Sequence, residues 1–300
     1  MKFSILTATY NRAKYLPRLY KSMVDNMDDS YEIEWLIMDD GSTDNTEEVC
    51  KNFVNKKNLV VKYYKQENQG KMQAINNLGQ YVSGELWIEC DSDDYFVKNA
   101  FQIIKQHYEK NKEQQDIYAF AFLKYNQNKK NMGQNFKKEK TTMFDLYFKE
   151  GENGEKALAF VADIRRKYHH ELEHGEKFVT EARMYHKMDK DYKILCINEP
   201  IMICEYQESG YSKNINNEFI NNPFGYYQYF YEILNNMDTK NIVFKKRLYV
   251  IKHYILFSYL THQKCRINVR GVKDKILIVL LYIPGYIKSY LYKKKLRRTK

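Results

Sequence analysis

Three aspartates within four positions, Asp91, Asp93 and Asp94, are the side chains whose type and spacing most clearly suggest chemistry. Carboxylates so close together raise each other's pKa unless a cation lies among them. Carboxylate oxygens suit Mg²⁺ or Mn²⁺, with phosphate oxygens completing the coordination. Alternate residues of an extended segment point the same way, so we expect Asp91 and Asp93 to share a face. An acidic turn without a metal is the alternative, because turns favour Asp and Ser.

Strands and helices are predicted to alternate around this cluster. Apolar runs at 3–9, 33–38, 59–64 and 86–88 predict short buried strands, and helical spacing of apolar residues between them predicts amphipathic helices. This alternation predicts βαβ units and a parallel, right-handed sheet. Such sheets bind ligands at the carboxyl ends of their strands. Four polar segments are expected to meet at that edge, namely 9–11, 39–42, 68–71 and 91–94.

The order and spacing of these segments resemble the nucleotide-binding half of the family 2 glycosyltransferases, which have the GT-A fold. The resemblance covers about the first 100 residues and is carried by 4–12 (SILTATYNR), 39–44 (DDGSTD), 68–71 (NQGK) and 91–94 (DSDD). Thr9 departs from the pattern, since many members have proline there. The resemblance implies an α/β fold in which helices flank a Rossmann-like, mostly parallel sheet.

The resemblance also implies roles for individual residues. The nucleotide-binding residues that it indicates are Thr9, Tyr10, Asn11, Asp39, Asp40, Asn68, Lys71, Asp91 and Ser92. Within that set, Asp39 or Asp40 would accept a hydrogen bond from a base such as uracil, and Asp91 would meet the ribose. Asp93 would bind a divalent cation, Mn²⁺ or Mg²⁺, that neutralises charge on the departing diphosphate. Asp94 would be either a further metal contact or the N-terminal anchor of the next helix.

A catalytic base is expected beyond residue 150, because an inverting glycosyltransferase needs an acidic side chain near the acceptor hydroxyl. Residues 175–181 (GEKFVTE) resemble a segment of a bacterial subgroup of these enzymes in which the acid precedes a helix. By that match Glu181 is the base, with Thr180 in place of the usual proline. Alternatively, Glu181 is only a helix-terminal acid favoured by the macrodipole. Glu176 and Asp163 are weaker candidates.

The predicted GT-A domain covers residues 1–215. Its last residues, from Tyr206 on, match a Tyr-x-x-x-Gly-x-Ser/Thr segment that closes over the diphosphate in related enzymes. By that match Ser212 and Lys213 are weaker candidates for contacts with phosphate. The competing interpretation is a polar turn that leads out of the domain.

Charge and cysteine usage suggest where the protein works. The five cysteines are scattered and odd in number, which favours reduced thiols in a cytoplasmic protein. The N-terminus becomes polar too soon for a signal peptide, so we expect the mature chain to start near residue 2. Residues 237–300 carry 17 lysines and arginines against two acids, a net charge of +15, whereas the remainder carries −4. Such asymmetry points to a polyanionic partner for the basic part.

Residues 216–300 are expected to form a basic, aromatic-rich helical region. The apolar segment 276–287 is shorter than the roughly 20 residues that span a bilayer. A basic amphipathic helix with aromatic residues lies in the membrane interface instead, so we predict contact with an anionic membrane surface. The alternative is packing on the catalytic domain or on a second subunit of a homodimer. Nucleic acid is not expected as a partner, because no helix-turn-helix, zinc-finger or RNP pattern occurs.

These features predict a cytoplasmic, inverting glycosyltransferase, peripheral on the inner face of a bacterial membrane. It would transfer a sugar from a nucleotide donor, UDP-linked by the resemblance, to a hydroxyl of a surface glycan such as capsule or lipopolysaccharide, or to a lipid-linked oligosaccharide. A sugar-1-phosphate nucleotidyltransferase is one alternative, but residues 9–12 lack the glycine that its loop needs. A non-catalytic membrane- or nucleic-acid-binding protein is another, and it would tolerate replacement of Asp93.

Overall fold

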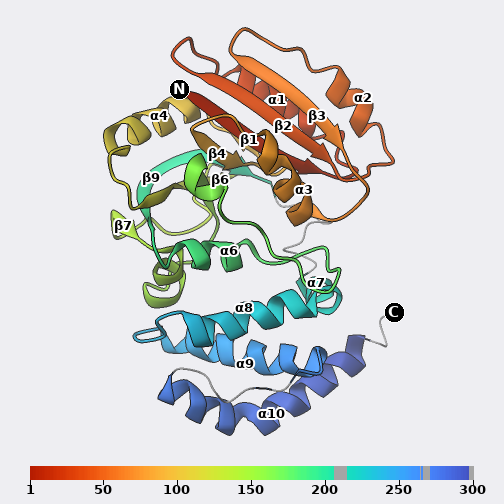
Figure 1. The fold of residues 1–300 in the computed structure, drawn as a ribbon, viewed down its shortest axis with the longest axis vertical. Coiled ribbons are helices and arrows are strands. Elements are labelled where there is room, and N and C mark those ends of the chain that lie inside the picture. Colours follow the sequence, from red (N-terminus) through yellow and green to blue (C-terminus); the bar gives the residue numbers. More distant parts are fainter. Residues whose placement is uncertain (206–214, 264, 266–270, 297–300) are drawn as a thin grey trace. The chain divides into compact units, whose positions relative to one another are not determined.

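The computed structural model describes residues 1–205, 215–263, 265 and 271–296. Within these residues a mixed sheet has the strand order β3-β2-β1-β4-β8-β6-β9-β5, with β7 also paired to β9 (Figure 1). The strands are β1 (Lys2–Thr9), β2 (Glu32–Asp39), β3 (Leu59–Lys65), β4 (Leu86–Glu89), β5 (Tyr95–Phe96), β6 (Ile117–Asn126), β7 (Lys140–Thr141), β8 (Lys156–Val161) and β9 (Lys193–Cys204).

The first four strands pair in parallel, as the alternating sequence pattern predicts. β1 lies between β2 and β4, and β2 pairs with β3. In this register Thr9 is opposite Asp39 and Leu6 is opposite Glu89, so the three strands end at the same edge. The predicted α/β fold with flanking helices is therefore confirmed.

The rest of the sheet is mixed. β8 runs antiparallel to β4 and β6, and β6 pairs in parallel with β9. Residues 193–204 form the single strand β9, with register shifts against β6 near Pro200. A proline lacks the N–H that a regular ladder requires, which is consistent with this local irregularity.

Helices connect and flank the strands. They are α1 (Leu16–Val24), α2 (Thr46–Lys51), α3 (Lys71–Leu78), α4 (Ala100–Asn111), α5 (Ala162–Arg165) and α6 (Glu181–Met188), and, toward the C-terminus, α7 (Ile215–Asn221), α8 (Pro223–Asn236), α9 (Phe244–Leu260) and α10 (Val272–Leu296). The predicted C-terminal helical region is therefore present. Among the described residues, no helix combines the length and hydrophobicity that crossing a bilayer requires.

The chain divides into two compact units. The first comprises residues 1–143, 152–170 and 187–208, and contains the sheet. The second comprises residues 144–151, 171–186 and 209–300. Its two early segments belong there because they bond to C-terminal helices: Arg183 pairs with Glu232 of α8 at 2.8 Å, and the carbonyl of Phe148 accepts the amide of Val243 at 2.9 Å. The predicted boundary at residue 215 separates the two regions along the sequence, but the two units defined by contacts do not follow it.

Candidate active site

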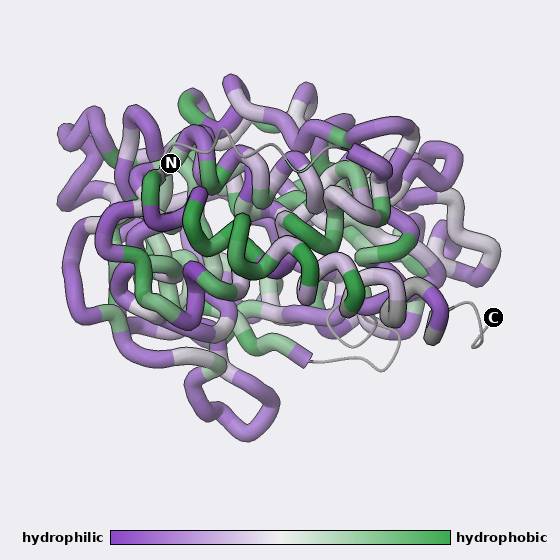
Figure 2. The backbone as a smooth tube through the Cα atoms, turned by 90° about the horizontal axis from the view of Figure 1, so that it is seen from below, coloured by the Kyte–Doolittle hydropathy of each residue, from purple (hydrophilic) through white to green (hydrophobic). Residues whose placement is uncertain are grey.

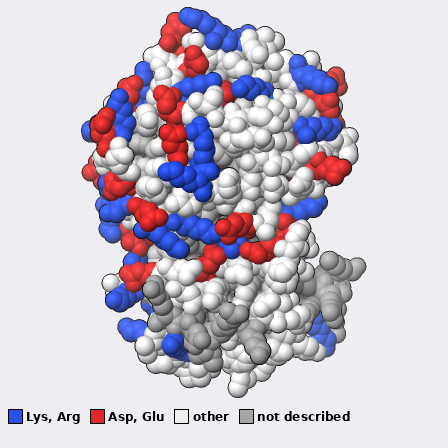
Figure 3. Space-filling model, in the orientation of Figure 1, with Lys and Arg blue, Asp and Glu red and all other residues white. Residues whose placement is uncertain are grey.

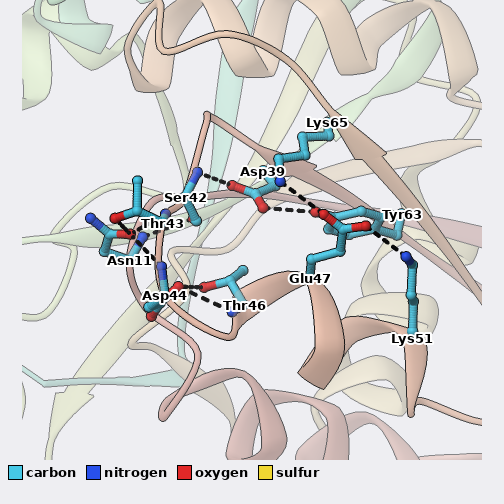
Figure 4. A network of polar contacts seen from close by, with 10 residues as sticks. All are labelled: Asn11, Asp39, Ser42, Thr43, Asp44, Thr46, Glu47, Lys51, Tyr63 and Lys65. Carbon is cyan, nitrogen blue, oxygen red and sulfur yellow. Dashed lines mark hydrogen bonds and ion pairs between the residues drawn. The ribbon is translucent and has the colours of Figure 1, made fainter.

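Asn11 ties the loop after β1 to the loop after β2 (Figure 4). Its backbone has a positive φ of 51°, a conformation that Asn tolerates better than most residues. The Asn11 side-chain oxygen accepts the backbone amides of Thr43 at 2.8 Å and Asp44 at 3.3 Å. The backbone amide of Asn11 also donates to Ser42 Oγ at 2.9 Å. Asn11 therefore shapes the edge at which the nucleotide is expected, while neighbouring Tyr10 is exposed.

Asp39 and Asp40 are both buried, and both hold loops at the same edge. Asp39 accepts the Ser42 amide and the Tyr63 hydroxyl, each at 2.7 Å (Figure 4). Asp40 accepts the Gly70 amide at 2.8 Å, and its carbonyl accepts the side chain of Asn68 at 3.0 Å. The Asp40 carboxylate also accepts the Gln66 side chain at 2.7 Å and the Gln69 amide at 2.8 Å. Because a carboxylate has about four lone-pair sites, these bonds leave two sites on Asp39 and one on Asp40 for a ligand.

The loop before α3 brings Lys71 to the acidic cluster. Gly70 has φ 92° and ψ 158°, a backbone conformation essentially confined to glycine. This turn directs the Gly70 amide to Asp40 and starts α3 at Lys71. Lys71 Nζ then lies 2.7 Å from Asp91 Oδ1. The structure therefore brings together all four polar segments that the sequence places at strand ends.

Residues 91–94 form a turn and do not continue β4. The amide of Asp94 donates to the carbonyl of Asp91 at 3.0 Å, and β4 ends at Glu89. The extended segment that we expected at Asp91 and Asp93 is therefore not formed, and a turn positions both residues. Each carboxylate instead has its own cationic partner: Asp91 with Lys71 at 2.7 Å, Asp93 with Arg12 at 3.1 Å, and Asp94 with Lys124 at 2.9 Å.

The three carboxylates have different proton affinities. Burial and the neighbouring carboxylates raise the pKa of Asp93 to about 6, although Arg12 acts in the opposite direction. Desolvation would raise the pKa of Asp91, but Lys71 and Lys124 hold it below its ordinary value. Burial raises the pKa of Asp94 even though Lys124 lies beside it. The surroundings of Asp93 and of Asp94 thus disfavour the charged carboxylate, whereas those of Asp91 favour it.

Asp94 and Lys124 form an ion pair in the interior that sequence reasoning missed. Only 2% of the Asp94 side chain and 12% of the Lys124 side chain is exposed. Lys124 also lies 3.4 Å from Glu155. Asp94 does not anchor the next helix, as one expectation had it, because β5 intervenes and α4 begins only at Ala100. The sequence feature that could have revealed this ion pair is the lysine itself, since Lys124 stands near the end of the otherwise apolar run 117–125.

Two arginines bind the acidic turn and the end of the strand that precedes it. Arg18 of α1 donates to the carbonyl of Asp93 at 2.8 Å, and its guanidinium lies 4.4 Å from the ring centre of Tyr95. Arg165 of α5 is 1% exposed and lies 2.9 Å from Glu89 at the end of β4. Nothing in the local sequence marks either arginine as part of a site, because each reads as an ordinary helix-surface charge.

A divalent cation fits the carboxylates of this turn if a ligand supplies further oxygens. Within the part of the chain that the structure describes, no three His, Cys, Asp or Glu side chains are arranged to hold a metal ion. Mg²⁺-type sites, however, often use one or two carboxylates plus substrate phosphates. Asp91 and Asp93 provide such a pair. Thr9 Oγ1, at the end of β1, is buried without a hydrogen-bond partner, which leaves it available to a ligand.

The predicted base lies in the second compact unit. Glu181 is the first residue of α6 and is partly buried. Its charge contributes to raising the pKa of Tyr226, after the larger effect of burial. Arg183, two residues further along α6, is buried and pairs with Glu173 at 3.0 Å and Glu232 at 2.8 Å. These ion pairs fix the start of α6 against α8.

The weaker candidates have other surroundings. Glu176 accepts the backbone amides of Phe224 and Gly225, each at 2.7 Å, and so caps the N-terminus of α8. Asp163 is 87% exposed and pairs with Arg166 of its own segment. The structure thus gives Glu176 a local structural role and places Asp163 at the surface. Ser212 and Lys213 lie outside the described residues.

Sequence comparison identifies the family. The sequence model of "Glycosyl transferase family 2" matches residues 4–173, which is more than half of the chain. An uncharacterized glycosyltransferase of Mycoplasma genitalium is 34% identical over 127 residues, covering 41% of this chain and 42% of that protein. Poly(ribitol-phosphate) beta-N-acetylglucosaminyltransferase TarS of Staphylococcus aureus is 33% identical over 112 residues, covering 36% and 20%. These matches span less than half the length of either relative.

Structure comparison agrees on the fold. A crystal structure of S. aureus TarS 1–349 has a TM-score of 0.60 at 17% identity, covering 100% of this chain and 92% of that one. A mannosyltransferase of Pyrobaculum calidifontis, solved with GDP-Man and Mn²⁺, has a TM-score of 0.56 at 13% identity, covering 97% and 84%. At such identities the likeness shows a shared fold. With the family match, it shows that this chain belongs to the family 2 glycosyltransferases and has their GT-A fold.

Proposed function

We propose that this protein is an inverting, metal-dependent glycosyltransferase that uses a UDP-sugar. The acidic turn at residues 91–94 carries the proposal, because it lies at the ends of parallel strands beside Asp40 and Lys71. Loops at such an edge are where α/β sheets bind nucleotides. The TarS structures with UDP-GlcNAc and with UDP support this choice of donor for the fold, and UDP-N-acetylglucosamine is therefore the first donor to test.

In this proposal the nine nucleotide-binding candidates keep the roles that the family resemblance implies. Asp39 or Asp40 accepts a hydrogen bond from the base, and Thr9 offers a buried hydroxyl that has no other partner. Lys71 and Arg12, which pair with Asp91 and Asp93, supply positive charge beside the diphosphate. Partly buried, positioned charges of this kind stabilise a developing negative charge more strongly than water does.

Asp93, with Asp91 nearby, would hold the divalent cation. When bound, the cation neutralises charge on the leaving diphosphate. The raised pKa of Asp93 supports this role, because its surroundings leave the carboxylate short of positive charge. The Mn²⁺ in the mannosyltransferase complex shows that a protein of this fold can bind such a cation with its nucleotide sugar.

Glu181 would accept the proton of the acceptor hydroxyl. The hydroxyl oxygen forms a bond to the anomeric carbon on the face opposite the diphosphate, the bond from that carbon to the diphosphate oxygen breaks, and the proton passes to the Glu181 carboxylate. The position of Glu181 at the first turn of α6 also fits a purely structural role, which the experiment below separates.

The acceptor in this proposal is a hydroxyl of a bacterial surface polymer or of its lipid-linked precursor. Two relatives support a cell-surface polymer: TarS is named for poly(ribitol-phosphate), and a protein of Bacillus subtilis that is 24% identical over 178 residues is named for minor teichoic acid biosynthesis. Such an acceptor would place the enzyme at the cytoplasmic face of the membrane, held there by its basic C-terminal region.

A donor screen tests the enzyme proposal. Purified protein is incubated with UDP-GlcNAc, other UDP-sugars and GDP-mannose, with Mn²⁺ or with a chelator, and released nucleotide and melting temperature are measured. We expect turnover and a melting shift for at least one UDP-sugar, both lost with the chelator. Asp93→Asn should reduce turnover at least about 100-fold, because a metal ligand that carries charge is lost. Asp29→Asn, at an 82% exposed aspartate of the same unit, is the matched control. Absence of turnover and of any shift with every donor contradicts the proposal.

Glu181→Gln tests the base. Loss of a general base lowers the transfer rate by about 10²–10⁴-fold. Transfer to an acceptor should fall by that factor while the donor-induced melting shift persists. Glu48→Gln removes another first-turn helix acid, in α2, and should leave transfer unchanged. If Glu181→Gln transfers sugar at the normal rate, Glu181 is not the base.

A further inference from the structure

One side of α10 packs on α9, and that side is the less apolar of the two. Asp274, Ile278 and Ser289 are buried along it. Asp274 pairs with Arg247 of α9 and accepts the Thr239 hydroxyl at 2.9 Å. Gly285 lies so close to Ile255 of α9 that an added Cβ would meet it at 3.0 Å. A charged, a small and a hydroxyl-bearing residue therefore face the protein interior.

The opposite side of α10 is apolar and exposed. Val272 and Ile283 are each 70% exposed and Leu280 is 66% exposed. The other large apolar residues exposed on the helix are Ile276, Val279, Tyr282, Tyr286, Ile287 and Tyr290. At about 100° per residue these nine positions cover roughly 160° of the helix circumference. Figure 2 shows the middle turns of this helix, which leads to the C-terminus, in the green of hydrophobic residues. We call these nine residues the outer face of α10.

This polarity is the reverse of that of an ordinary surface helix. A helix at the surface of a soluble protein turns its apolar stripe inward and its polar side to water. Contiguous exposed apolar surface of this kind marks an interaction site. Here Asp274, which is the only acid from residue 272 to the end of the sequence, is buried and paired, while the outer face carries apolar side chains. Among the described residues nothing covers the outer face, which marks it as an interaction site.

The positive charge around the outer face indicates which kind of partner it binds. Lys273 and Lys275 are both exposed. At about 100° per residue, Lys273 lies just beyond one border of the outer face and Lys275 lies just inside the other. Seven further lysines and arginines follow between residues 288 and 300, and residues 237–300 together carry +15. On the face that Figure 3 shows, basic and acidic side chains are interspersed over the upper part, and few acidic side chains are visible among the described residues at the lower end. Two copies of this surface facing each other would repel, whereas an anionic surface with an apolar interior would match both the charge and the apolar residues.

We propose that the outer face of α10 inserts into the interface of an anionic lipid bilayer, with the helix parallel to the membrane plane. The aliphatic side chains enter the acyl boundary, the tyrosines lie at the level of the headgroups, and the flanking lysines contact lipid phosphates. This assigns residues to the membrane attachment proposed above. It does not depend on the glycosyltransferase proposal, since vesicle binding and donor turnover are measured separately.

Vesicle co-sedimentation with the full chain tests the proposal. The probes are vesicles of phosphatidylcholine alone and vesicles with one third phosphatidylglycerol, at low and high salt. We expect binding to the anionic vesicles and a partial loss of binding at high salt. The double variant Leu280→Asn, Ile283→Asn should lower vesicle affinity at least tenfold. Both residues are exposed, so the melting temperature should be unchanged. Val54→Asn, at a 61% exposed valine of the first unit, is the matched control and should bind normally.

Insertion is separated from adsorption by fluorescence. Ile283→Trp places a reporter on the outer face, while the native Trp35 and Trp87 are buried. Brominated lipids should quench the new tryptophan but not the native ones. Unchanged vesicle binding of the double asparagine variant, or absence of quenching, overturns the proposal. A third result would also overturn it: the parent protein is a dimer in analytical ultracentrifugation, the double asparagine variant is a monomer, and the parent protein binds no vesicles. The outer face would then contact a second copy of the chain.

Discussion

Replacing Lys124 by methionine tests how the acidic turn is held. Lys124 reaches Asp94 from β6; the Asp94 side chain is buried and the Lys124 side chain is 12% exposed. Methionine keeps most of the volume and removes the charge. It leaves Asp94 without its cation and Glu155 without one of its partners. The expected result is a large loss of stability, because an uncompensated buried carboxylate is strongly unfavourable.

The magnitude follows from the distance. At 2.9 Å two unit charges attract by about 6 kcal/mol with an effective dielectric constant near 20, and the desolvation of Lys124 offsets part of this attraction. Removal of one partner from a buried pair typically destabilises a protein by about 3–5 kcal/mol. At about 2–4 °C per kcal/mol, the melting temperature should fall by roughly 6 °C or more.

A double-mutant cycle measured by thermal and urea unfolding checks this reasoning. Asp94→Asn combined with Lys124→Met should recover about 2 kcal/mol or more relative to the sum of the single changes, since the buried carboxylate at position 94 is then no longer left without a cation. Lys57→Met removes an ion pair in which both partners are about 80% exposed, and it should change stability by less than about 0.5 kcal/mol. If the Asp94 and Lys124 variants add within about 0.5 kcal/mol, the ion pair does not hold the turn.

Two further predictions concern single positions elsewhere. Burial among Phe144, Phe148 and Tyr229 lowers the pKa of His186 from 6.5 to about 3, so the stability that neutral His186 contributes is present above pH 6.5 and is lost as the pH falls toward 3. Between pH 7.5 and 5 the free energy of unfolding of the parent protein should therefore fall by about 2 kcal/mol through His186, and the His186→Phe variant should not show this loss. Thermal unfolding at several pH values measures the difference, and the same pH dependence of the melting temperature in both proteins would contradict the prediction. Gly70→Ala should destabilise by about 1–3 kcal/mol in thermal unfolding, because alanine is strained at φ 92°, ψ 158°, and an unchanged melting temperature would show that the loop relaxes.

Local sequence patterns determined the four parallel strands β1 to β4, several helices and the four polar segments of the site. Apolar runs at 3–9 and 33–38 specify buried strands because hydrophobic periodicity is a property of neighbouring residues. Parallel pairing then brings the strand ends to one edge whatever the details of packing. The amphipathic pattern of α1 and the helical pattern of α9 could likewise be read from sequence.

Only the tertiary structure decided which groups surround the acidic turn. Lys124 reaches Asp94 across 30 positions of sequence, and Arg12 reaches Asp93 across 81, because the strand order places β6 and the end of β1 beside the turn. No local pattern encodes such pairings. For the same reason the sequence could not show that Glu176 caps α8, 48 residues away.

The C-terminal helix shows the same division. An apolar, basic segment was evident from composition, and with it the prediction of a membrane surface. Which side of α10 packs inward depends on Asp274 finding Arg247 and on Gly285 approaching Ile255, both of which are contacts between helices. Those contacts turn the apolar side outward. Ion pairs and close packing between distant segments, unlike periodicity, exist only once the chain has folded.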